Sequence, residues 1–434
     1  MSRPRRGTIA EALKIREEAR RAETAPPILN WLRNTVGLRP TMEDRTATLR
    51  SRVGRGSPFW MAGLIAAFVL ALPARADSGP LVPASSPAAD TAQVTIQTNP
   101  GAATLTLRPV ATLGDQVGSG ILSDDAQVSM GPSGRFYVAD RVTAPGHLLV
   151  YDSSGAFLTH IGREGEGPGE YLFPRPPWFS GEEMHVFDPL SSRWTVLTLD
   201  GEVRETRRLR IDPISATSVE LVGGGEYLVV AGVSHVPDRI GQPFHLVDPS
   251  GTIVRSFGSH TGAFTPEMLQ EFSRRMAPIT DSTFLAAHTS RYEIELWTVQ
   301  GDRLMSYCRQ EDPGAWVDRG GGPPWETPPS RSIHDIAVDD RSRVWVMIRD
   351  RAADWAPREC PRYGDDGRCR FYRDEIDEFY RTTVEVLDLR EARVVARAEF
   401  PGRLIGFLAP GLTYSYRATD GTYEVARLSE GRER

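Results

Sequence analysis

The sequence predicts an all-β fold, a six-bladed β-propeller of four-stranded antiparallel blades. Three observations support this prediction. A phrase made of a turn, an alternating apolar strand and a polar end recurs along the chain, a hairpin follows most copies, and the last unit lacks one strand. A period of about 45 residues built from short strands is typical of a propeller or a similar array.

The repeated phrase is clearest at residues 131–140, which read GPSGRFYVAD. Alternation of apolar and polar residues after a turn predicts a strand with one face buried. Weaker copies follow along the chain: 184–188 (MHVFD), 227–231 (YLVVA), 284–288 (FLAAH), 344–348 (VWVMI) and 413–417 (TYSYR). Each copy is expected to be the second strand of one blade, which predicts six blades.

The hairpins supply the third and fourth strands of each blade. Glycine at their turns allows a positive φ, which tight hairpins need. The hairpins lie at residues 148–159, 194–204, 244–254 and 294–304. A fifth copy at 384–395 has lost its glycine.

The last unit ends after residues 423–428 (YEVARL), before a fourth strand. Residues 103–113 (ATLTLRPVATL) have strand composition but no blade of their own. We expect this N-terminal strand to complete the last blade, because that pairing closes the ring and removes two exposed sheet edges. The propeller is therefore predicted over residues 103–430, after a flexible linker at 77–102 that is rich in Pro, Ala, Ser and Thr.

Residues 42–76 resemble a secretory signal peptide. An apolar run at 59–72 follows four arginines and precedes Ala74-Arg75-Ala76, an A-x-A cleavage pattern. We expect translation to begin at Met42, so that residues 1–41 are outside the protein or form a disordered extension. The alternative is an uncleaved anchor, but the run is shorter than the roughly 20 residues of a comfortable membrane span. No stable membrane span is expected in the mature chain, which is predicted to be periplasmic or extracellular.

The charge of the chain argues against one class of function, and its cysteines predict a disulfide. The chain carries a net charge of −6, and the part after the signal segment is more acidic than the whole, so nucleic-acid binding is not expected. Three cysteines, Cys308, Cys360 and Cys369, occur late in the chain. In an exported protein we favour a disulfide between Cys360 and Cys369, which bracket a polar loop, although three pairings are open.

Residues 161–171 (IGREGEGPGEY), together with the YVAD of the first copy, resemble the NHL-type six-bladed β-propeller family, whose blade junctions read G-x-G-x-G-x-G-x-F before a strand. The resemblance is strong over 120–175, and the later units keep only its strand pattern. It implies the propeller fold and little about activity, because propellers serve both as binding modules and as lyases or lactonases.

The predicted register sorts the loops into two faces. Turns between strands 1 and 2 and between strands 3 and 4 are short, whereas the opposite face receives long segments: residues 231–243, 260–272, 310–330 and 350–380. Long insertions on one face of a rigid scaffold commonly carry binding. The two longest segments are neighbours, and we expect them to form a lid together.

The ends of the strands on this long-loop face carry the candidate ligand-binding residues: Asp140, Arg141, Asp188, His235, His288, Arg291, His334, Arg349, Asp350 and Arg417. One interpretation is that strands simply end in polar residues at a surface. The other is a ring of Arg, His and Asp around the channel mouth that holds an anionic or polar ligand.

His235, His288 and His334 are also the candidate metal ligands, because imidazoles from separate blades can converge near a propeller axis. No ligand spacing, catalytic motif or calcium-loop pattern supports a specific ion, so no cofactor is predicted and zinc or calcium are the ions to consider. The sequence favours a non-catalytic exported propeller that binds a peptide, a glycan or a protein partner. The alternative is a metal-dependent hydrolase or lyase, similar to propeller lactonases or amidating lyases, with its site at the channel mouth.

Overall fold

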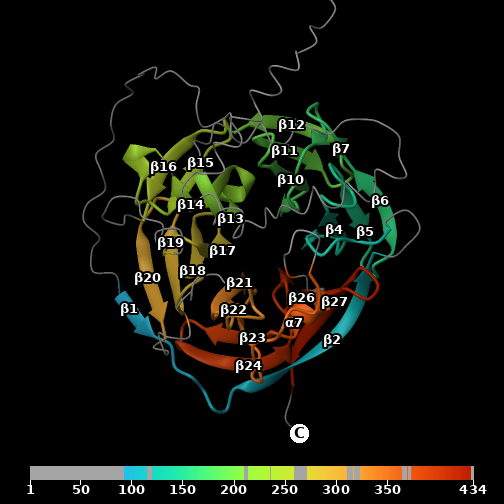
Figure 1. Cartoon of the computed structure of the whole chain (residues 1–434). Helices are drawn as coiled ribbons and strands as arrows, with labels where there is room; N and C mark the ends of the chain where they lie inside the picture. Colours follow the sequence, from blue (N-terminus) through green and yellow to red (C-terminus); the bar gives the residue numbers. More distant parts are fainter. Residues whose placement is uncertain are drawn as a thin grey trace, which may run out of the picture. The chain divides into compact units, whose positions relative to one another are not determined.

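The computed structural model describes residues 92–114, 120–209, 214–234, 236–258, 271–309, 316, 323–363, 369 and 373–431. They belong to one compact unit, residues 88–434. The predicted signal peptide, the N-terminal extension and His235 lie outside the described residues. Small antiparallel sheets surround a common centre, with β13, β17 and β21 on the inside and β12, β16 and β20 on the outside (Figure 1).

The first three blades are separate four-stranded sheets. Blade 1 contains β3 (Gln127–Met130), β4 (Phe136–Ala139), β5 (Leu148–Tyr151) and β6 (Phe157–Ile161). Blade 2 contains β9 (Trp178–Ser180), β10 (Glu183–Asp188), β11 (Arg193–Thr198) and β12 (Val203–Arg208). Blade 3 contains β13 (Ile214–Val222), β14 (Tyr227–Ser234), β15 (Phe244–Val247) and β16 (Ile253–Phe257). The short strands β7 (Arg163–Glu164) and β8 (Glu170–Tyr171) pair between blades 1 and 2.

The last three blades are tied together by the N-terminal strands. Blade 4 contains β17 (Arg274–Thr280), β18 (Thr283–His288), β19 (Glu293–Thr298) and β20 (Arg303–Cys308), and β1 (Ala92–Thr95) joins its outer edge. Blade 5 contains β21 (Ser332–Val338), β22 (Arg343–Arg351), β23 (Tyr380–Asp388) and β24 (Arg393–Pro401). Blade 6 contains β25 (Gly406–Ala409), β26 (Leu412–Arg417), β27 (Thr422–Glu430) and β2 (Ala103–Leu113).

The N-terminal strand β2 completes blade 6, as the sequence predicts. It pairs antiparallel with β27 from Leu105 opposite Glu430 to Leu113 opposite Tyr423. Its first residues, Ala103 and Thr104, also pair in parallel with β24, so blades 5 and 6 form one eight-stranded sheet. The ring is therefore closed by a strand that comes from the beginning of the propeller sequence.

Six buried apolar clusters lie among the described residues, one between each pair of neighbouring blades. The cluster between blades 6 and 1 packs Leu113, Tyr423 and Val425 against Val138 and Tyr151. Because each blade presents one apolar face to each neighbour, no blade can bury its own core alone. The cluster between the first and last blades confirms that the ring closes.

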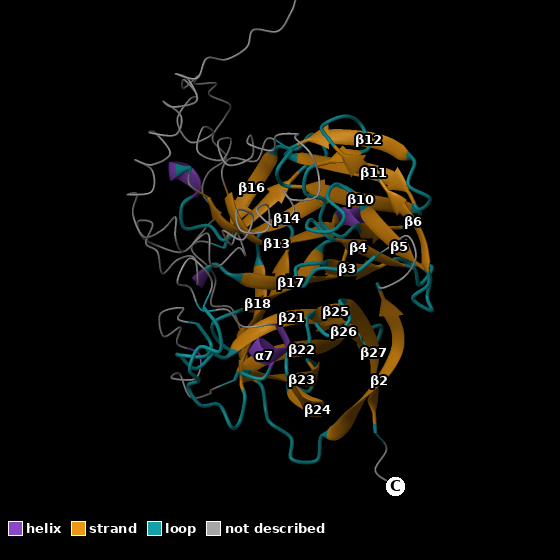
Figure 2. Ribbon diagram, turned by 45° about the vertical axis from the view of Figure 1, so that its right-hand side comes forward, coloured by secondary structure: helices purple, strands orange, loops and turns teal. Residues whose placement is uncertain are grey.

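Residues 92–97 belong to the predicted linker at 77–102, but the structure pairs them with two blades. β1 runs parallel to β20, Ile96 is buried, and Gln97 bridges to Arg393 on β24. Figure 2 shows that strands dominate the regular structure of the described residues, with loops and turns between them. The short helical elements include the 3-10 turns η1 (Gly223–Gly225) and η2 (Pro237–Arg239) and the helix α7 (Arg373–Asp377). None of the helices in the described residues combines the length and apolar character needed to cross a membrane.

Candidate functional site

Asp140 and Asp188 end the second strands of blades 1 and 2, and both carboxylates are buried. Asp140 accepts hydrogen bonds from the Ser123 amide at 2.6 Å and hydroxyl at 2.7 Å, and from the Val142 amide at 2.9 Å. Each aspartate thus joins the loop after its strand to the segment that enters the same blade. Their acceptor positions are occupied within the protein.

Asp188 repeats this arrangement in blade 2. It accepts hydrogen bonds from the amides of Leu172 at 2.7 Å, Leu190 at 3.0 Å and Ser191 at 3.2 Å. The recurrence of the same contacts in two blades explains the aspartate at the end of the repeated phrase as a structural clasp.

Two predicted arginines lie outside any shared site. Arg141 donates to Asp125 at 3.2 Å and lies 5.2 Å from the centroid of the Phe173 ring. Arg417, on blade 6, lies 3.6 Å from Asp420 and 3.7 Å from Glu424 with about half of its side chain exposed. Exposed ion pairs of this kind contribute little to stability.

In blade 5 the corresponding aspartate is Asp350, which is buried and bound by arginine side chains. Arg331, just before β21, donates two hydrogen bonds to one oxygen of Asp350, at 2.9 and 2.7 Å. Arg381 on β23 contacts the same oxygen at 3.4 Å. In blade 5 an Arg–Asp ion pair therefore joins the end of the second strand to the segment that enters the blade. Backbone amides make this connection in blades 1 and 2.

His288 and Arg291 belong to a partly buried ion-pair network in blade 4. The Nη2 atom of Arg291 lies 2.7 Å from Nε2 of His288. Burial, and next the charge of Arg274, lower the pKa of His288 to about 4, so this imidazole is neutral at neutral pH. A neutral imidazole can accept the hydrogen bond from Arg291 at this nitrogen.

Ligand atoms of His288, Glu293 and Glu295 lie within 4.8 Å of one another, a spacing compatible with a metal ion. Three guanidinium groups contact the same carboxylates: Arg291 at 2.6 Å from Glu293, Arg303 at 3.0 Å and Arg274 at 3.6 Å from Glu295. They already neutralise the two glutamates and would repel a cation. The chemistry of this group therefore fits an ion-pair network better than a metal centre.

The structure brings two predicted residues, His334 and Arg349, together near the ring axis. His334 lies on the inner strand β21, and burial followed by the charges of Arg349 and Arg275 lowers its pKa well below the usual value. Arg403, which connects blades 5 and 6, also acts on His334. Blades 4 and 5 and the connection to blade 6 thus contribute three arginines whose charges help to keep one imidazole neutral.

Tyr380 lies beside two of these arginines. The guanidinium carbons of Arg403 and Arg349 lie 5.1 and 5.9 Å from the centroid of its ring. Both distances are within the range of cation–π attraction, which holds the guanidinium planes in place. We name this group the axial cluster; it consists of Arg275, His334, Arg349, Tyr380 and Arg403.

Two carboxylates next to the axial cluster were not predicted. Asp335 on β21 accepts a hydrogen bond from the Phe407 amide at 2.7 Å, yet burial raises its pKa. Burial, and next the negative charge of Asp335, raise the pKa of Glu220 on β13 to about 8. Charged residues at inner-strand positions, where small or apolar residues are usual, were the sequence signal that could have identified Glu220, Arg275 and Asp335.

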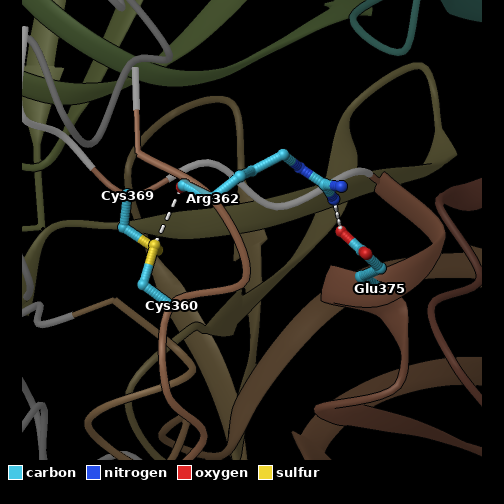
Figure 3. Close-up of a disulfide and its surroundings, with 4 residues drawn as sticks. All are labelled: Cys360, Arg362, Cys369 and Glu375. Carbon is cyan, nitrogen blue, oxygen red and sulfur yellow. Dashed lines mark hydrogen bonds and ion pairs between the residues drawn. A yellow bond between two sulfur atoms is a disulfide. The ribbon is translucent and has the colours of Figure 1, made fainter. Parts of the chain in front are cut away.

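The long loop of blade 5 contacts the axial cluster through Asp377 and Arg403. The predicted disulfide between Cys360 and Cys369 is present, with the Cα atoms 5.6 Å apart. Figure 3 shows the disulfide beside Arg362, whose guanidinium pairs with Glu375 on α7. Cys308 is the free cysteine and is partly buried. The disulfide and the ion pair therefore fix α7 to its own loop.

This loop also contacts the axial cluster and the other long connection. Asp377 of α7 forms an ion pair with Arg403. Trp355 Nε1 donates to the Pro324 carbonyl at 2.8 Å, and the Arg358 amide donates to the Trp325 carbonyl at 2.9 Å. The described parts of the two longest loops thus touch each other, whereas the segments 259–270, 310–315 and 317–322 lie outside the described residues.

The comparisons with known proteins support the fold class. A family model described as a 6-bladed beta-propeller, DUF5128, matches residues 126–228. This match agrees with the six blades of the structure. It supports the propeller class and leaves the resemblance to the NHL type as a prediction. No curated protein matches the chain in sequence.

Solved structures resemble the chain at low identity. A Bacteroides fragilis protein described as exported has 12% identity and a TM-score of 0.49, covering 78% of this chain and 99% of its own. A DUF4221 family member from Bacteroides vulgatus has 10% identity and a TM-score of 0.45, covering 76% and 98%. A streptogramin B lyase has 11% identity and a TM-score of 0.39, covering 76% and 98%.

Proposed function

We propose that the chain is an exported, non-catalytic binding propeller that holds an acidic group of a peptide, a glycan or a protein partner at the axial cluster. The observation that carries the proposal is that Arg349 and Arg403 both lie against the Tyr380 ring, and that their charges and that of Arg275 act on His334. Guanidinium groups form charge-assisted, often bidentate hydrogen bonds with carboxylates and phosphates. Because His334 stays neutral, it can bind a ligand by hydrogen bonding without adding charge.

The surroundings of the axial cluster suit binding. The disulfide-linked loop of blade 5 holds Arg403 through Asp377, so this side of the site is pre-organised. The chain as a whole carries a net charge of −6. The three arginines outnumber the two carboxylates that interact with them, Asp377 with Arg403 and Asp335 with Arg275, which favours an acidic ligand.

Export is part of the proposal. A secretory signal peptide over residues 42–76 would deliver the propeller to the periplasm or the extracellular space. The disulfide between Cys360 and Cys369 supports this, because structural disulfides persist mainly in oxidising compartments.

The alternative, a metal-dependent hydrolase or lyase, requires imidazoles that face a cation. The charges of Arg275, Arg349 and Arg403 instead lower the pKa of His334. His288 contacts Arg291, and the charge of Arg274 lowers its pKa. A zinc or calcium ion at either histidine would be repelled by these charges. Stoichiometric metal in the purified protein that is lost on His334→Ala would favour the enzyme and contradict the binding proposal.

Binding is tested on arrays of acidic and neutral peptides and oligosaccharides with the full chain, Arg349→Gln and Arg351→Gln. We expect acidic members to bind wild type, and Arg349→Gln to weaken them about tenfold through loss of a charge-assisted contact. Arg351, at the end of the same strand and exposed, is the matched control. The proposal is wrong if neutral members bind equally well, or if both substitutions have the same effect.

A further inference from the structure

A cavity of about 550 Å³ lies between blades 4 and 5, and no residue of the axial cluster lines it. Four arginines line its walls: Arg309, Arg331, Arg381 and Arg397. Glu385 is the one carboxylate among the lining residues. The volume is in the range of small-molecule binding sites, which is roughly 300–1,000 Å³.

The four arginines come from separate segments of the two blades. Arg309 follows β20, Arg331 precedes β21, and Arg381 and Arg397 lie on β23 and β24. Only the packing of blade 4 against blade 5 brings Arg309 to the other three.

Glu385 organises one wall of the cavity. Its carboxylate is buried and accepts hydrogen bonds from the Tyr292 hydroxyl at 2.7 Å and from Arg309 at 2.9 Å. Arg309 also lies 3.9 Å from the centroid of the Tyr292 ring. Arg309 is thus held between an aromatic face and a carboxylate, in a fixed orientation that costs little entropy when a ligand binds.

Arginines outnumber carboxylates among the described side chains that line the cavity. Of the charged side chains that line the cavity in the described residues, four are arginines and one is Glu385. Asp350 and Glu399 pair with three of the arginines from beside the cavity. The hydroxyls of Thr95, Thr98 and Thr383 add neutral hydrogen-bonding groups to the lining. Arginines with hydroxyl groups are a typical environment for phosphate and sulfate oxygens.

The described lining contains no aromatic side chain, and its apolar members are Ile96 and Ile348. Sugar rings and nucleobases are usually held by stacking on aromatic faces, so these ligands are disfavoured. We propose that this cavity binds a tetrahedral oxyanion, the phosphate or sulfate group of a small molecule. The proposal is independent of the function proposed for the axial cluster.

The N-terminal segment closes one side of this cavity. Thr95, Ile96, Gln97 and Thr98 line it. The Ile96 amide donates to the Cys308 carbonyl at 2.7 Å in blade 4, and the Gln97 amide donates to the Ala392 carbonyl at 2.8 Å in blade 5. A bound oxyanion would therefore connect this segment to both blades and slow its amide exchange.

Titration calorimetry of the full chain with inorganic phosphate, inorganic sulfate and malonate tests the proposal. The variants are Arg397→Gln and the matched control Arg393→Gln, because both arginines lie on β24 and their side chains are 48% and 47% exposed. Only Arg397 lines the cavity. We expect at least one of the anions phosphate and sulfate to bind. Wild type and Arg393→Gln should bind it with equal affinity, and Arg397→Gln should bind it about tenfold more weakly.

Binding of only phosphate or only sulfate supports the proposal and shows which of the two groups the natural ligand carries. Equal losses in both variants, malonate binding tighter than both anions, or no binding of phosphate or sulfate at millimolar concentration would overturn it. Hydrogen exchange of Ile96 and Gln97 provides a readout that does not depend on a variant. Slower exchange with the bound anion is expected, and unchanged exchange in its presence contradicts the predicted position of the ligand.

Discussion

At the residue scale, one position in the repeat carries different chemistry in different blades. The aspartate that ends the second strand accepts backbone amides in blades 1 and 2, whereas Asp350 accepts arginine side chains in blade 5. In blade 4 the position holds His288, which is neutral and bound to Arg291. Where the second strand ends, the polar groups of the chain lose their partners in the sheet. In each of these blades a side chain at this position forms hydrogen bonds that replace them.

Buried neutral histidines should make the stability of the propeller depend on pH. Burial, and next the charge of Arg239, lower the pKa of His245 from 6.5 to about 4. Between these two values the unfolded chain binds a proton that the folded chain does not, so stability falls as pH falls from 6.5 to 4. The loss approaches about 1.4 kcal/mol for each pH unit.

Urea unfolding across this pH range measures the effect. His245→Gln should remove part of the slope, and His160→Gln, at an exposed position, is the control. An unchanged slope in His245→Gln would show that this imidazole is not protonated on unfolding.

At the element scale, the turn between strands 3 and 4 also contacts the preceding blade. Gly155, Gly201, Gly251 and Gly301 all have positive φ, between 78° and 94°. A Cβ atom on Gly251 would lie 2.2 Å from the Arg208 carbonyl oxygen of blade 2. These glycines therefore serve both the hairpin and the interface between blades, which explains why they recur.

Gly251→Ala should destabilise the protein by about 2 kcal/mol or more, because the left-handed backbone and the clash with a neighbouring backbone both oppose the methyl group. Gly181→Ala is the matched control, since Gly181 has φ of 57° and open space around it. It should cost about 1 kcal/mol, the backbone penalty alone. Chemical denaturation measures both, and equal losses would show that the contact between blades contributes nothing.

At the scale of the whole molecule, closure depends on a strand far from its partners in sequence. Without β2, blade 6 would have three strands, and the clusters on both sides of it would lose Leu105 and Leu113. Ring closure also gives every apolar blade face a partner, so the blades stabilise one another. β1 instead adds a fifth strand to a complete blade.

Truncation tests this difference. Removing all residues through Leu113 should abolish cooperative thermal unfolding, whereas removing residues through Thr95 should lower stability and leave cooperativity intact. Moving residues 103–113 behind Gly431 should restore folding, because the Gly431 amide already donates to the Thr104 carbonyl at 2.7 Å. Cooperative unfolding of the chain that lacks β2 would contradict closure by this strand.

The local pattern determined most of the fold. The alternating strands at 136–139 and 184–188, the hairpin turns and the partner of Cys360 are all readable over short stretches, because strand period and turn chemistry depend on neighbouring residues. The closing strand was predicted because the last unit lacks a fourth strand and residues 103–113 form a strand that belongs to no other blade. These features needed no knowledge of side-chain positions.

Only the tertiary structure decided which polar residues share a site. Asp140 and Asp188 end strands as predicted, but their carboxylates are occupied by their own loops. Arg275, Arg403 and the four arginines of the inter-blade cavity come together because blades pack side by side. Convergence across blades depends on ring geometry and side-chain direction, which join residues far apart in the chain and leave no local pattern in its sequence.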